Sequence, residues 1–172
     1  GVRDSDADAL EAQDGKTVML GSQTLNNPNY TGYASFSSGG PRTGDSGVRP
    51  SVTAPGVSIS SAAVGTGSDS EILSGTSMAA PMVAGVAALV VQAHPTWSAQ
   101  DVSAAIVSTA KSAKTADYQL PLGGQGQVDP AAAVATSSVL LGDSVKTSAG
   151  TVREPALSFG FAELSKTYKV TK

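Results

Sequence analysis

The longest apolar run of the chain lies near its middle, at residues 82–91. It reads Met-Val-Ala-Gly-Val-Ala-Ala-Leu-Val-Val and has no polar face, which is typical of a helix buried on all sides. Pro81 stands just before this run. We expect Pro81 in the first helical turn, where the N–H that proline lacks would be unpaired anyway. Since His94 ends the pattern, the sequence predicts a central core helix over residues 77–93.

Two shorter helices are predicted downstream of this one. Ser98 is a candidate N-cap with Asp101 at the third helical position, and Asp129 caps a second helix with Pro130 at its first position. This second helix is expected to end at about Thr136. The helix after Ser98 should bury a stripe made of Val102, Ala105, Ile106 and Ala110.

The apolar positions before the central helix predict short strands. Residues 1–20 are expected to form a short helix and then a strand, and residues 33–41 a strand that runs into a Gly-Pro turn. Val52, Val57 and Ile59 suit a buried strand.

Two stretches are rich in small and polar residues, 61–70 and 111–127, and both are expected to be loops. From residue 139 onward apolar and polar residues alternate, for example around Val152 and over 156–161. This alternation predicts half-buried strands.

Composition narrows the class of protein. Hydrophobic residues make up 40% of the 172 residues and charged residues 15%, which indicates a globular domain with a core. The net charge of −3 and the pI near 5.0 argue against a nucleic-acid partner, because no basic stripe is present to meet phosphates. With no cysteine there is no thiolate metal site. The apolar run is shorter than the ~20 residues that a bilayer requires, so a membrane is not expected as a partner either.

A candidate for chemistry precedes the central helix. Ser77 lies in the octet Ser-Gly-Thr-Ser-Met-Ala-Ala-Pro at residues 74–81. A hydroxyl at a helix N-terminus lies beside unpaired N–H groups and the positive end of the helix dipole, which would stabilise an oxyanion. A serine near the start of an apolar helix is nevertheless more often a structural residue. Asp69 and Glu71 are close in sequence, but we interpret them as solvated loop charges.

The full octet resembles the nucleophile motif of the subtilisin-like serine proteases, Gly-Thr-Ser-Met-Ala-x-Pro, at every fixed position. Residues 34–41 and 49–59 also resemble segments of this family, although Arg49 stands where lysine is usual. The resemblance implies an α/β fold that represents the C-terminal part of a subtilisin-like domain. Such a fold has a mostly parallel sheet flanked by helices, and a truncated β extension would follow it.

The resemblance also implies a division of the chain. Residues 1–20 would be the tail of a protease-associated insert, and residues 21–138 the C-terminal part of the catalytic domain. Residues 139–172 would be the truncated start of a fibronectin type III-like domain.

The implied activity is that of a serine endopeptidase acting on proteins or peptides through an acyl-enzyme on Ser77. Gly75, Thr76 and Met78 would line the substrate side of the site, and no metal or cofactor is expected. A secreted or cell-surface location is implied by the family, although residues 1–6 do not resemble a signal peptide.

A general base for Ser77 is not recognisable in the sequence. His94 is the only histidine, and a helix over 77–93 would place it about 25 Å along the axis from Ser77. The family's Asp-Thr/Ser-Gly and His-Gly-Thr-His segments do not occur, and no asparagine matches the oxyanion-hole position. We therefore expect this chain alone to be inactive and to need the upstream part of its catalytic domain. A non-catalytic binding or scaffold module is the alternative.

Overall fold

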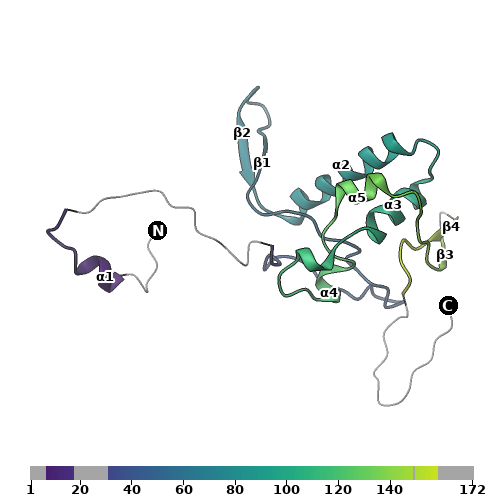
Figure 1. Cartoon of the computed structure of the whole chain (residues 1–172), viewed down its shortest axis with the longest axis horizontal. Helices are drawn as coiled ribbons and strands as arrows, with labels where there is room; N and C mark the ends of the chain where they lie inside the picture. Colours follow the sequence, from purple (N-terminus) through teal and green to yellow (C-terminus); the bar gives the residue numbers. More distant parts are fainter. Residues whose placement is uncertain (1–6, 18–30, 149, 159–172) are drawn as a thin grey trace, which may run out of the picture.

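The computed structural model describes residues 7–17, 31–148 and 150–158. The predicted α/β class is confirmed: this part of the chain contains helices and small sheets, with a run of helices between two pairs of strands (Figure 1). The helices are α1 (Ala7–Glu11), α2 (Thr76–Ala93), α3 (Ala99–Ser108), α4 (Leu120–Gly123) and α5 (Pro130–Ala135), with a 3₁₀ turn at Ser112–Lys114. The strands are β1 (Ile59–Ala62), β2 (Ser70–Leu73), β3 (Ser144–Thr147) and β4 (Gly150–Arg153).

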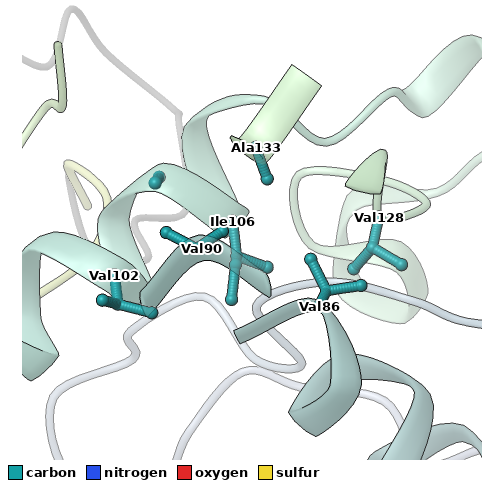
Figure 2. Packing of buried hydrophobic residues seen from close by; sticks show 7 residues of the cluster. Val86, Val90, Val102, Ile106, Val128 and Ala133 are labelled. Atoms are coloured by element: carbon teal, nitrogen blue, oxygen red, sulfur yellow. The ribbon is translucent and has the colours of Figure 1, made fainter. Parts of the chain in front are cut away.

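The core lies where α2, α3 and α5 pack together. Figure 2 shows apolar side chains from these helices pointing toward one another, and Val90 of α2 is completely buried among them. The cluster consists of Val86, Val90, Val102, Ala105, Ile106, Val128 and Ala133. Three of the four residues predicted as the buried stripe of α3 belong to it, whereas Ala110 follows the helix and is half-buried.

The starts of α3 and α5 are built as predicted. The Ser98 hydroxyl accepts the Asp101 N–H at 3.2 Å, and the Asp101 carboxylate accepts the Ser98 N–H at 3.0 Å, which completes a capping box. Asp129 caps α5 by accepting the Ala132 N–H at 3.0 Å, and Pro130 is the first helical residue. Local capping chemistry therefore sets both helix starts.

The prediction that α2 is buried on all sides is wrong for the described residues. Only Val86 and Val90 of its 18 residues are buried, because α3 and α5 pack against one side of the helix. Met82, Leu89 and Val91 remain between 41% and 51% exposed. The helix is longer than the apolar run, and its length and mean hydropathy of 1.6 would suffice to cross a membrane. A mostly buried core helix can meet the same criterion, but only 11% of this window is buried, at Val86 and Val90.

The strands pair in antiparallel hairpins. β1 pairs with β2, with Ile59 opposite Leu73, and β3 pairs with β4, with Ser144 opposite Arg153. Within the described ranges, parallel pairing is limited to a single bridge between Thr53 and Gln127. A parallel sheet needs several neighbouring strands that are covered on both faces. In the described residues, the parallel pairing that we predicted amounts to this one bridge.

Several local predictions for the loops and strands need correction. Residues 33–41 form an irregular segment with one turn at 35–36 rather than a strand. The stretch 61–70 is a loop only over 63–69, because its ends belong to the β1–β2 hairpin. Val57 is 54% exposed instead of buried. The stretch 111–127 contains the 3₁₀ turn and α4. The strand expected up to residue 20 lies largely outside the described residues, as do the later alternating positions, 159–172.

Candidate active site

Ser77 is the second residue of α2, and its side chain is exposed. Gly75 is the N-cap, and its carbonyl accepts the N–H groups of Met78 at 3.0 Å and Ala79 at 3.4 Å. In the described part of the chain, the N–H groups of Thr76 and Ser77 donate to no backbone carbonyl. The Ser77 hydroxyl therefore lies beside free donors at the positive end of an 18-residue helix.

The residues predicted to line the substrate side surround this helix start. Thr76 is exposed, whereas Gly75 and Met78 are half-buried. A Cβ atom at Gly75 would lie 3.6 Å from both the Ser77 nitrogen and the Met78 sulfur. Both distances are ordinary van der Waals contacts, so Gly75 lies directly against the Ser77 N–H and the Met78 side chain.

The sequence predicts Pro81 in the first turn of the helix, and this prediction is wrong. Pro81 is the sixth residue of α2, because the helix begins earlier, at Thr76. Proline lacks the N–H that would bond the carbonyl four residues before it, so Pro81 leaves the Ser77 carbonyl without its helical donor. Ser77 therefore lacks one helical hydrogen bond, the one that its carbonyl would accept from the N–H of residue 81.

Gly56 supports the turn that carries Ser77, a role that sequence reasoning did not find. Its carbonyl accepts the Gly75 N–H at 2.7 Å. A Cβ atom at Gly56 would lie 2.8 Å from the Gly75 carbonyl oxygen and 3.2 Å from the Ala79 Cβ. Close to this contact, the Ser58 N–H donates to the Ser74 hydroxyl at 2.8 Å. The Pro55-Gly56 pair was the available signal, since a glycine in extended chain often marks a close backbone approach.

His94 is held far from Ser77 by its own contacts. It caps the C-terminal end of α2, its Nε2 lies 2.9 Å from the Val134 carbonyl oxygen, and its ring stacks on Trp97 with centroids 3.8 Å apart. At 1.5 Å per residue, the helix separates His94 from Ser77 by about 25 Å. His94 therefore joins α2 to α5 and is not a base for Ser77.

The carboxylate Asp129, whose pKa is strongly shifted, lies away from the start of α2, at the start of α5. The hydrogen bond from Lys111, followed by that from the Ala132 N–H, holds the pKa of Asp129 well below its usual range. Asp69 and Glu71 are exposed on the β1–β2 hairpin, as expected for solvated charges. Among the described residues, no cluster of three His, Asp or Glu side chains could hold a metal ion.

Comparison with known proteins identifies the family. The model of the subtilase family matches residues 10–139, so the chain belongs to this family. It is 39% identical to the subtilisin-like protease SBT4.12 of Arabidopsis thaliana over 140 residues. This alignment covers 73% of the chain and 19% of SBT4.12. For SBT4.4 of the same plant, the identity is 42% over 107 residues, 55% of this chain and 14% of the relative.

A third Arabidopsis relative is named a CO(2)-response secreted protease. It is 44% identical over 90 residues, which cover 45% of this chain and 11% of the relative. The chain therefore spans about a fifth or less of the length of these curated relatives.

Proposed function

We propose that Ser77 is the nucleophile of a subtilisin-like serine endopeptidase. The observation that carries this proposal is the exposed Ser77 hydroxyl at the start of α2, next to the free N–H groups of Thr76 and Ser77. Family membership supports it, since the match includes the whole octet. The substrates are proteins or peptides, with Gly75, Thr76 and Met78 on the substrate side, and no metal or cofactor takes part.

The chemistry is acyl transfer in two steps. The Ser77 Oγ attacks the carbonyl carbon of the scissile peptide bond while a general base takes the hydroxyl proton. The carbonyl oxygen becomes an oxyanion, which the Ser77 N–H and the helix dipole stabilise. The C–N bond breaks as the amine leaves with that proton, and water then hydrolyses the Ser77 ester.

The base comes from outside these 172 residues. His94 is the only histidine, and its distance from Ser77 exceeds the roughly 3 Å that proton transfer requires. We therefore propose that the upstream part of a subtilase domain supplies the base and its aspartate, and that this chain alone is inactive. The exposed apolar side chains Met82, Leu89 and Val91 give such a part a surface to cover.

Cleavage of an unfolded protein substrate by a longer protein that contains this chain tests the proposal. Ser77→Ala should reduce cleavage to the background. The matched control is Ser61→Ala, because Ser61 is exposed on β1 and is assigned no chemistry. Full activity of Ser77→Ala would refute the assignment. Cleavage by the 172-residue chain alone would refute the proposal that the general base comes from outside this chain.

A second candidate function is a non-catalytic binding or scaffold module. The separation of His94 from Ser77 favours it. The intact octet opposes it, because a binding module has no physical need for a serine nucleophile beside free N–H groups. Loss of activity on Ser77→Ala distinguishes the two.

The finer organisation of the chain also remains our proposal. We assign residues 1–20 to the tail of a protease-associated insert, 21–138 to the catalytic domain, and 139–172 to the start of a fibronectin type III-like domain. One relative is named a CO(2)-response secreted protease, which supports a secreted or cell-surface location. The low pI supports the absence of a nucleic-acid partner, and the core contacts of α2 favour a protein environment over a membrane.

A further inference from the structure

Two arginines converge on one carboxylate near the end of the described chain. The Arg42 Nη2 lies 2.9 Å from Oε1 of Glu154, and the Arg49 Nη2 lies 2.7 Å from Oε2. The Glu154 side chain is only 15% exposed, and each of its two oxygens is hydrogen-bonded to a guanidinium group in place of water. Burial alone would raise the pKa of Glu154, but the hydrogen bonds from Arg49 and Arg42 outweigh it, and the pKa lies below its ordinary value.

Both guanidinium groups are oriented by neighbours in their own loop. Arg42 Nε donates to Asp45 at 2.9 Å, and the same carboxylate accepts the Gly47 N–H at 3.1 Å. Arg49 Nη1 donates to the Val48 carbonyl at 2.7 Å, while its Nη2 is directed to Glu154. This division of donors needs the planar fork of an arginine, which a lysine does not have.

Glu154 is fixed by its backbone as well as by its side chain. Its carbonyl accepts the Gly142 N–H at 2.7 Å, and its own N–H donates to the Asp143 carbonyl at 2.9 Å. These bonds close the base of the β3–β4 hairpin. The hairpin also reaches α3, because the Arg153 N–H lies 3.3 Å from the Gln100 side-chain oxygen.

We propose that Arg42 and Arg49 form a carboxylate clamp that docks the segment 140–158 onto the subtilase part of the chain through Glu154. The family match ends at residue 139, so the clamp joins residues inside the match to residues beyond it. The occupant of the site is the base of the β3–β4 hairpin of the same chain. The interface is polar and depends on charge, because each guanidinium donates one charge-assisted hydrogen bond to one oxygen of Glu154, and such bonds are roughly twice as strong as those between neutral groups.

The clamp also constrains the loop that leads to the candidate nucleophile. After Arg49 the chain continues to Thr53, whose N–H donates to the Gly126 carbonyl at 2.8 Å, and then to Gly56 beneath the Gly75 turn. The docked segment and the Ser77 turn are thus attached to opposite ends of residues 49–56.

Hydrogen exchange of the 172-residue chain tests the clamp, read by mass spectrometry on peptides covering 142–154. Glu154→Gln keeps the shape but removes the charge, and we expect these amides to exchange about tenfold faster, since hydrogen bonds to charged groups contribute at least this factor. Glu71→Gln removes an exposed glutamate from β2 as the matched control and should leave the exchange unchanged. Equal exchange in both variants would overturn the proposal.

Three further variants, Arg49→Lys, Arg49→Gln and the double variant, keep the test decisive if Glu154→Gln perturbs the whole fold. Arg49→Lys retains the charge and should give an intermediate acceleration confined to the same peptides. Combining Arg49→Gln with Glu154→Gln should accelerate exchange by much less than the product of the single effects, because both remove one interaction. Fully multiplicative effects would overturn the clamp.

Discussion

Gly56 gives the sharpest test of how the candidate nucleophile is held. Replacing it by alanine adds a Cβ atom 2.8 Å from the Gly75 carbonyl oxygen, about 0.6 Å closer than ordinary van der Waals contact. The obstructing atom belongs to the backbone of the helix N-cap, so the turn itself must move. Inserting a methyl group into such a contact typically costs ~1–3 kcal/mol. We therefore expect Gly56→Ala to lower the free energy of unfolding by about 2 kcal/mol.

The matched control is Gly85→Ala, which adds the same methyl group to α2. A Cβ atom there meets nothing within 4 Å, and alanine favours a helix interior over glycine by about 1 kcal/mol. Urea unfolding of the two variants should shift their midpoints in opposite directions. In a longer, active protein, Gly56→Ala should also slow acylation of Ser77. Equal stability of Gly56→Ala and the parent would refute the argument.

Three other predictions concern the capping box, the acid response and the methionine beside the nucleophile. Ser98→Ala should lower the free energy of unfolding by about 1 kcal/mol in urea titrations, whereas Ser98→Thr should retain most of the stability. Because the folded pKa of Asp129 is depressed, its contribution is complete above its unfolded value of about 3.9 and is lost as the pH falls below it. Lys111→Met should flatten this part of the stability curve, and an unchanged curve would contradict the ion pair. Peroxide should slow acylation of Ser77 in the active protein through sulfoxide formation at Met78. Leucine at position 78 should prevent this loss, and protection by leucine at Met82 instead would contradict it.

Features set by neighbouring residues were predictable from the sequence. The capping residues Ser98 and Asp129 were identified because an N-cap acts within three positions of itself. The place of Ser77 at the start of a helix followed from the apolar run behind it. Such contacts require no knowledge of the rest of the fold.

Features that join distant residues were missed. The contact of Gly56 with Gly75 and the pairing of Glu154 with Arg42 link segments whose proximity depends on the folded chain. The β1–β2 hairpin was read partly as a loop because β2 is exposed along its whole length and has no alternating pattern. The exposure of α2 was not predicted. Its apolar residues indicate that the helix tends to be buried, but they do not show which other part of the protein packs against it.

Labelling with a fluorophosphonate, with mass spectrometry to locate the adduct, tests the central claim most directly. The reagent reacts with a serine whose hydroxyl is activated, whatever the substrate preference. Our account predicts no adduct on the 172-residue chain and an adduct on Ser77 once an upstream subtilase segment is supplied. An adduct on Ser77 in the chain alone would show that a base is present within it. An adduct on a different serine in the complemented protein would contradict the assignment of Ser77.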